Sequence, residues 1–219
     1  MAKVKICGIT NVADARAAVE AGADAFGLIF AASPRCVSAQ QARDIVGAAG
    51  SGACVPVGVF VDEPVARIVE IAAFAGLRCL QLHGNEQPQV VGQLLSRGYD
   101  VVKSFRVAPS ADVIAMLQPY PATAYLLDTF VPGQAGGTGR TFDWSLARAA
   151  APGMRVIVSG GLGVDNVLDA IRLSQPYGVD ASSRLELKPG VKDPDKVREF
   201  IRLVKSASPA AVSVTRWPR

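Results

Sequence analysis

Residues 4–30 read VKICGITNVADARAAVEAGADAFGLIF and contain one complete strand–helix–strand unit. The apolar run Val4–Cys7 predicts a strand, and Val12–Ala21 has the periodicity of a helix. Gly22 stands where that helix should end, because glycine adopts the left-handed conformation of a helix end at little steric cost. Ala25–Phe30 follows directly and predicts a second strand. The order strand, helix, glycine, strand is typical of a parallel α/β fold.

The same order of elements recurs along the chain. The apolar runs are short, partly β-branched and rarely alternate with polar residues, which is typical of strands covered on both faces of a parallel sheet. We expect eight strands, at Val4–Cys7, Ala25–Phe30, Val55–Phe60, Cys79–Leu82, Val101–Phe105, Ala124–Leu127, Arg155–Val158 and Gly178–Ala181. Beyond the first helix, helical periodicity is clearest at Ala39–Ala48, Pro64–Ala75, Asp165–Ser174 and Pro194–Lys205.

Eight strand–helix units account for residues 1–205 and leave no room for a second domain. Strict alternation of strand and helix favours a single-domain α/β fold, the (β/α)₈ TIM barrel. An open, doubly wound sheet is the alternative, but no Gly-x-Gly-x-x-Gly motif follows the first strand. Residues 206–219 have no place in this scheme, and we expect them to form a loose tail.

Composition excludes several classes of protein. Of the 219 residues, 50% are hydrophobic and 19% are charged, and the net charge is +4, so the chain is not disordered. No apolar stretch approaches about 18 residues, and the N-terminus lacks the pattern of a signal peptide. We therefore expect a cytoplasmic protein without a membrane or nucleic-acid partner, since the basic residues are scattered. A modest positive charge suits an anionic small molecule.

Cysteine and histidine counts argue against a bound metal. The four cysteines have no Cys-x-x-Cys spacing, which indicates free thiols rather than a disulfide framework. His83 is the single histidine, whereas zinc sites need several nitrogen or sulfur ligands close together. We expect the protein to use neither a metal nor a cofactor.

Cys7 and Asp128 are candidates for acid–base chemistry, because the active site of a parallel barrel lies at the carboxyl ends of its strands. Cys7 could be an ordinary small core residue, but a lowered pKa would make it a base or a nucleophile. Asp128 could simply start a turn, but a half-buried carboxyl can have a pKa high enough to donate a proton. Together they supply the base and the acid that a proton-shifting isomerase requires.

Glycines and serines follow the last two predicted strands. Gly160 and Gly161 stand after the seventh strand, and Ser182 and Ser183 stand after the eighth. Loops at these two places commonly bind phosphate in such barrels through backbone N–H groups and hydroxyls, although the same residues could form simple tight turns. Arg184 could add a positive charge to this site or project outward.

Two more side chains and one loop could take part in binding. Arg35, next to Pro34, could hold a carboxylate through two parallel hydrogen bonds or be an ordinary surface arginine. His83, at the end of the fourth strand, could line the pocket or be structural. The glycine-rich loop 133–140 lacks the pattern of a nucleotide-binding P-loop, and we expect it to be a mobile cover over the phosphate end.

Seven motifs, in order, resemble those of the phosphoribosylanthranilate isomerase family of tryptophan biosynthesis. They are KICGIT (5–10), SPR (33–35), LQLHG (80–84), GGTG (136–139), SGGL (159–162), VDASS (179–183) and PGVKD (189–193). The resemblance spans nearly the whole chain. It has two departures: Arg184 stands where the family usually has glycine, and the loop before Ser33 is slightly short.

The resemblance implies a (β/α)₈ barrel that acts as an aldose–ketose isomerase. The reaction is the Amadori rearrangement of N-(5-phosphoribosyl)anthranilate to 1-(2-carboxyphenylamino)-1-deoxyribulose 5-phosphate. The family further implies Cys7 as general base, Asp128 as general acid and Arg35 near the anthranilate carboxylate. It also implies a phosphate site formed by Gly160, Gly161, Ser182 and Ser183. We expect a monomer or a homodimer acting on a small-molecule substrate.

Three other functions remain open at this point. A barrel isomerase acting on the aminoaldose of histidine synthesis resembles this chain but typically has aspartate in place of Cys7. Indole-glycerol-phosphate synthase would need lysines and glutamates at strand ends. A phosphate-ligand sensor without catalysis could keep the phosphate loops, but it would not need a paired acid and base.

Overall fold

Eight parallel strands form a closed barrel in the computed structural model, which describes residues 1–49, 52, 54–108, 111–129, 143–150, 153–207 and 217–218. The strands are β1 (Lys3–Cys7), β2 (Ala25–Ile29), β3 (Val55–Phe60), β4 (Cys79–Leu82), β5 (Asp100–Val107), β6 (Ala124–Thr129), β7 (Val156–Val158) and β8 (Gly178–Ala181). Each strand pairs with the next, and β8 pairs with β1 to close the ring. The predicted (β/α)₈ barrel is confirmed, and the open sheet is excluded.

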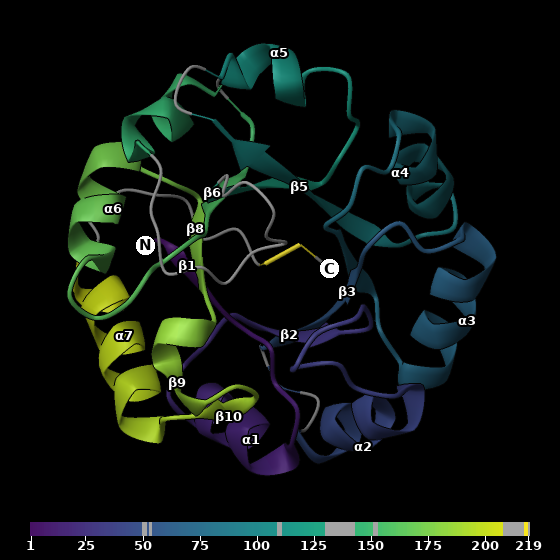
Figure 1. The fold of residues 1–219 in the computed structure, drawn as a ribbon, viewed down its shortest axis with the longest axis horizontal. Coiled ribbons are helices and arrows are strands. Elements are labelled where there is room, and N and C mark those ends of the chain that lie inside the picture. Colours follow the sequence, from purple (N-terminus) through teal and green to yellow (C-terminus); the bar gives the residue numbers. More distant parts are fainter. Residues whose placement is uncertain are drawn as a thin grey trace.

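Helices surround the barrel, as Figure 1 shows. They are α1 (Val12–Glu20), α2 (Ala39–Ala49), α3 (Val65–Ala75), α4 (Pro88–Leu95), α5 (Val113–Leu117), α6 (Val167–Ser174) and α7 (Pro194–Ser206), with a 3₁₀ helix η1 (Trp144–Ala149) after β6. Helix α3 begins one residue later than predicted, because Pro64 has an extended ψ of 137°. Within the described ranges, no helix is long and apolar enough to cross a membrane.

A small hairpin follows β8 and was not predicted. It begins with a 3₁₀ turn, η2 (Ser183–Leu185), and consists of the antiparallel strands β9 (Glu186–Lys188) and β10 (Val191–Lys192). Thr10, in the loop after β1, donates a hydrogen bond of 2.5 Å to the carbonyl of Gly190 in the hairpin turn. The hairpin is therefore held against the carboxyl end of β1, where Cys7 lies.

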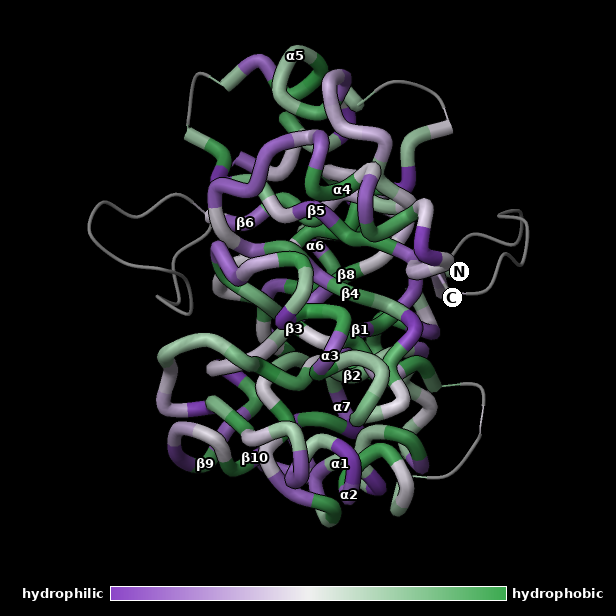
Figure 2. The backbone as a smooth tube through the Cα atoms, turned by 90° about the vertical axis from the view of Figure 1, so that its right-hand side faces the viewer, coloured by the Kyte–Doolittle hydropathy of each residue, from purple (hydrophilic) through white to green (hydrophobic). Residues whose placement is uncertain are grey.

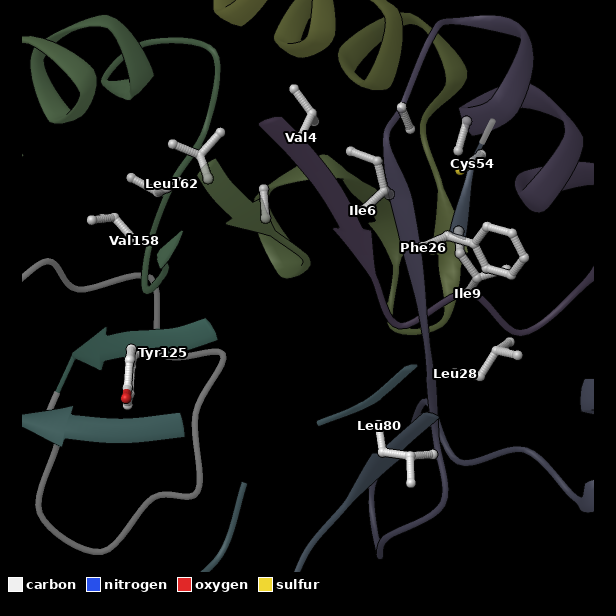
Figure 3. Close-up of a cluster of buried hydrophobic side chains, with 14 of the residues drawn as sticks. Val4, Ile6, Ile9, Phe26, Leu28, Cys54, Leu80, Tyr125, Val158 and Leu162 are labelled. Carbon is white, nitrogen blue, oxygen red and sulfur yellow. The ribbon is translucent and has the colours of Figure 1, made fainter. Parts of the chain in front are cut away.

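Successive side chains of a strand point to opposite faces, so the inward-facing and outward-facing side chains of the barrel strands pack into two separate hydrophobic cores. The larger core lies between the strands and the helices, and Figure 3 shows Val4 and Ile6 of β1 and Phe26 of β2 in it. The smaller core fills the inside of the barrel near the end at which the strands begin, here called the amino end. It consists of Ala25, Val57, Cys79, Val102, Ala124, Leu126, Ile157 and Trp217.

Trp217 covers this inner core from the amino end. Its side chain is 2% exposed, and its ring centroid lies 6.4 Å from that of Tyr177. Figure 1 shows the short yellow C-terminal segment over the middle of the ring of strands, and Figure 2 places both chain ends on one side of the barrel. The loose tail stays a prediction for residues 208–216, which lie outside the described residues.

Candidate active site

A cavity of about 280 Å³ lies at the carboxyl ends of the barrel strands. Among the residues that line it are all eight predicted site residues, namely Cys7, Arg35, His83, Asp128, Gly160, Gly161, Ser182 and Ser183. The thiol of β1 and the carboxyl of β6 thus face one shared space. Asp128 lies within β6 rather than after it, so its backbone is fixed by the sheet.

Cys7 is a buried thiol at the floor of the cavity. Burial raises the pKa of Cys7 above its ordinary value; the nearby Lys5 ammonium opposes this effect, and the Asp180 carboxylate adds to it. The pKa is not lowered, because loss of hydration outweighs the nearby positive charges of Lys5 and Lys192. The same shift makes the thiolate, once formed, a stronger base.

Lys5 and Asp180 form a buried ion pair next to Cys7. Lys5 Nζ lies 2.8 Å from Asp180 Oδ1, and the lysine side chain is 1% exposed. Asp180 also lines the cavity and accepts a hydrogen bond of 3.3 Å from the hydroxyl of Ser159. Burial alone would lower the pKa of Lys5, but the Asp180 carboxylate outweighs it and holds the pKa above its usual value. Lys5 is therefore an ammonium group.

Asp128 accepts a backbone hydrogen bond and faces a histidine. Its Oδ1 accepts the N–H of Thr129 at 2.8 Å, and its Oδ2 lies 3.4 Å from His83 Nε2. The amide nitrogen of Gln81 donates to His83 Nδ1 at 2.9 Å, which leaves Nε2 as the nitrogen that carries the proton toward Asp128. His83 is thus a pocket residue in contact with the acid.

A buried ion pair fixes the loop that carries His83. The Glu86 carboxylate accepts the N–H groups of Asp62 and Gly84, both at 3.0 Å, and Lys103 Nζ lies 2.9 Å from its second oxygen. Burial favours the neutral acid, but Lys103 and the backbone donors outweigh it and hold the pKa of Glu86 below its usual value. The loop after β4 is consequently pinned by charge-assisted hydrogen bonds.

The loop after β7 presents backbone N–H groups to the cavity. Gly160 and Gly161 have φ angles of 89° and 63°, a conformation that suits glycine and strains other residues. Gly160 also packs on the acid, since a Cβ there would lie 2.7 Å from Asp128 Oδ1. In the part of the chain that the structure describes, neither glycine N–H has a protein acceptor. Both are available to an anion.

The loop after β8 contacts the end of β1 that carries Cys7. Ser182 donates its hydroxyl to the carbonyl oxygen of Cys7 at 3.0 Å. Arg184, whose direction was left open, turns away from the cavity: it donates to the carbonyl of Gly161 at 3.1 Å and pairs with Asp165 at 2.9 Å. Arg184 therefore ties the loop after β8 to the loop after β7 rather than serving as a direct ligand.

Arg35 lines the cavity but is already engaged. Its Nε and one Nη donate to the two carboxylate oxygens of Glu186, both at 2.8 Å, and Lys192 Nζ lies 2.8 Å from the same carboxylate. The Glu186 hydrogen bonds raise the pKa of Arg35. The expected two-point grip on a ligand carboxylate is therefore wrong for this state, because Glu186 occupies that face of the guanidinium. The remaining Nη is available to a ligand.

Sequence reasoning missed several polar residues of the site. Lys5, Gln81 and Asp180 stand two residues before Cys7, His83 and Ser182, and side chains two apart share a strand face. Moving two residues back from each candidate at a strand end, to the previous side chain on the same face, would have found all three. Glu186 and Lys192 had no comparable signal, because the hairpin that brings them to Arg35 is a long-range feature.

Two further predictions concern a bound metal and the glycine-rich loop. No group of three histidine, cysteine, aspartate or glutamate side chains is placed to hold a metal ion within the described residues. The loop 133–140, predicted to cover the phosphate end, lies outside the described residues.

The closed barrel and its cavity place the protein in the class of (β/α)₈ barrels with a pocket at the carboxyl ends of the strands. A model of the family described as N-(5'-phosphoribosyl)anthranilate (PRA) isomerase matches residues 4–203. The chain therefore belongs to the phosphoribosylanthranilate isomerase family. The family match does not support the two alternative enzymes, namely the barrel isomerase of histidine synthesis and indole-glycerol-phosphate synthase.

Relatives and solved structures agree with the family. N-(5'-phosphoribosyl)anthranilate isomerase of Pelobacter propionicus is 47% identical over 94% of this chain and 96% of that protein. The phosphoribosylanthranilate isomerase of Thermotoga maritima has a TM-score of 0.85 and 38% identity, over 94% of this chain and 100% of the other. A structure of a phosphoribosylanthranilate isomerase with reduced 1-(o-carboxyphenylamino)-1-deoxyribulose 5-phosphate has a TM-score of 0.82 and 36% identity, with the same coverage.

Proposed function

We propose that this chain rearranges N-(5'-phosphoribosyl)anthranilate to its 1-deoxyribulose isomer in tryptophan biosynthesis, with Cys7 as general base and Asp128 as general acid. The observation that carries the assignment of roles is geometric. A thiol of β1 and a carboxyl group of β6 face one cavity, which the glycines after β7, the serines after β8 and the side chain of Arg35 also line. Such a site can hold a substrate with a phosphate at one end and a carboxylate at the other.

The acid step opens the sugar ring. Asp128, protonated on Oδ2, donates to the ring oxygen, the bond between that oxygen and C1 breaks, and the nitrogen lone pair forms the C1=N bond of a Schiff base. Oδ2 is the donating oxygen because Oδ1 already accepts the N–H of Thr129. His83, whose Nε2 lies 3.4 Å from Oδ2, is placed to donate a hydrogen bond to the carboxylate that remains once the proton has left.

The base step follows at the neighbouring carbon. The Cys7 thiolate removes the proton from C2, and the electrons of the broken C–H bond move toward the cationic nitrogen, which gives an enolamine. Tautomerisation of the enolamine yields the ketone. The substrate nitrogen accepts the electrons, so the step needs no metal or redox cofactor from the protein.

Two anchors position the reacting carbons. The N–H groups of Gly160 and Gly161, with Ser182 and Ser183, hold the phosphate, and the unoccupied Nη of Arg35 holds the carboxylate. Fixing both ends of the substrate removes several kcal/mol of barrier, because the acid and the base then act within one complex. Apolar side chains of β2 and β3, including Ile29 and Val59, line the wall between them and suit an aromatic ring.

The experiment is a turnover assay of the purified protein that follows the fluorescence of phosphoribosylanthranilate as it disappears. We expect Cys7→Ala and Asp128→Asn each to lower kcat by about 10²–10⁴ and to leave KM within a few-fold. Near-normal turnover in either variant would refute the role of that residue. Absence of turnover in the wild type would favour the sensor without catalysis.

Location and assembly are part of the same proposal. We infer a cytoplasmic enzyme that acts as a monomer or a homodimer. One related structure, from Thermotoga maritima, is described as monomers of a dimeric phosphoribosylanthranilate isomerase, and it is 36% identical to this chain. Sedimentation at several concentrations of this protein distinguishes the two states.

A further inference from the structure

Lys5 is a buried ammonium group that shares one face of β1 with Cys7. Val4 and Ile6 of β1 point outward, toward the helices (Figure 3), so Lys5 and Cys7 point into the barrel. The register of β1 against β8 puts Lys5 directly opposite Asp180. The ion pair therefore lies at the floor of the cavity, immediately beneath the thiol.

Gly27 of β2 brings the lysine and the thiol together. A Cβ at residue 27 would lie 2.7 Å from Cys7 Sγ and 3.2 Å from Lys5 Cε, so both side chains lie against the same bare stretch of backbone. Lys5 is within reach of a hydrogen bond to the sulfur as well as to Asp180. The ammonium group thus pairs with Asp180 and lies close enough to the thiol for its charge to act on it.

A buried ion pair is weak evidence for stability, because removing two charges from water costs several kcal/mol per ion. Here the pair lies beside a thiol that must lose its proton before it can act as a base. Four charged groups act on that thiol: Lys5 from β1, Asp180 from β8, Lys192 from β10 and Arg35 from the loop after β2. Lys5 alone among them adjoins the sulfur on its own strand.

We propose that Lys5 is a positioning residue of the reaction, whose ammonium, held in place by Asp180, donates a hydrogen bond to the Cys7 thiolate and stabilises it for proton abstraction. Asp180 has two opposite effects. It fixes the ammonium beside the sulfur, and its own negative charge disfavours the thiolate. The balance of the pair sets how much thiolate forms at a given pH. This inference rests on the proposed role of Cys7 as the base.

The test measures the rate of Cys7 alkylation by iodoacetamide against pH in the full chain, read by peptide mass spectrometry at Cys7. Lys5→Met should move the midpoint of this profile to higher pH by about one unit or more, because the thiolate loses its cation. Asp180→Asn should move it to lower pH, because the competing carboxylate is gone and the thiolate becomes the anionic partner that keeps Lys5 charged. A pair that serves only to hold the fold would give shifts in the same direction or none, and that result would overturn the proposal.

The double variant Lys5→Met/Asp180→Asn keeps the proposal testable if Lys5→Met alone does not fold, since it leaves no unpaired buried charge. Its midpoint should still lie above that of the wild type, and an unchanged midpoint would overturn the proposal. In the turnover assay, the acidic limb of the plot of kcat against pH should shift to higher pH in folded Lys5→Met, together with the alkylation midpoint. The KM of this variant should stay within about threefold of the wild type. Activity retained by Cys7→Ala would reject Cys7 as the base, yet the alkylation result would stand independently.

Discussion

The two halves of the barrel interior have opposite chemistry, although the same strands build both. Toward the amino end the inner positions are apolar and are covered by Trp217. Two residues further along several of these strands, the inner positions are polar: Cys79 is followed by Gln81, Leu126 by Asp128, and Ile157 by Ser159. The amino half supports the fold, whereas the carboxyl half holds groups whose burial costs stability and serves chemistry.

The largest effect should come from removing the residue that covers the amino half. We expect Trp217→Ala to lower the free energy of unfolding by about 3 kcal/mol, because a large buried side chain is lost. Urea unfolding followed by circular dichroism measures this change. Trp217→Phe, the matched control, should lose much less, and kcat should be unchanged in both. A stability equal to that of the wild type would mean that Trp217 does not seal the barrel.

Gln81, in the carboxyl half, should show the reverse behaviour. We expect Gln81→Leu to lower kcat/KM about tenfold, because His83 loses the partner that fixes its tautomer. The free energy of unfolding should change little: the bond to His83 is lost, but so is the buried Gln81 Oε1, which has no partner among the described residues and costs about 1–3 kcal/mol.

The control for Gln81 is a double-mutant cycle with His83→Ala. If Gln81 acts through His83, Gln81→Leu has no further effect on kcat/KM in the His83→Ala background. A full tenfold loss in that background would show that Gln81 acts on the substrate by another route.

Alkaline pH should weaken the amino half through Cys79. Burial raises the pKa of Cys79 from 9.0 to about 12. Because the folded state then holds its proton more tightly than the unfolded state, stability is lost as pH rises above 9.0, amounting to about 1 kcal/mol from this thiol near pH 10. Thermal unfolding across this range should be less pH-dependent in Cys79→Ala than in the wild type. Equal slopes would contradict the assignment.

The smallest effect is expected at the rim of the carboxyl half. Arg184→Gly removes the link between the loops after β7 and β8, and we expect KM to rise about threefold while kcat is unchanged, because only ground-state binding is affected. Asp165→Asn removes the charge that pairs with Arg184, so it weakens the same link and should also raise KM. A fall in kcat without a change in KM would assign Arg184 a part in the chemical step.

The fold was predictable from local signals, and the site only in part. Apolar runs and helix-ending glycines such as Gly22 and Gly76 are properties of short segments, so all eight strands were located within a few residues. Cys7, Asp128 and the glycine pair followed from their places at strand ends. The pKa direction of Cys7 and the engagement of Arg35 were missed, because both depend on groups that only the closed barrel brings together.

The protonated state of Cys7 also has a consequence for oxidation. Peroxides react with thiolates at accessible sulfur atoms and only slowly with neutral, buried thiols. Cys36 is the exposed free cysteine among the described residues, whereas Cys7 lies under the substrate cavity with a raised pKa. Oxidative damage should therefore accumulate on Cys36 first and spare Cys7, the proposed base, between turnovers.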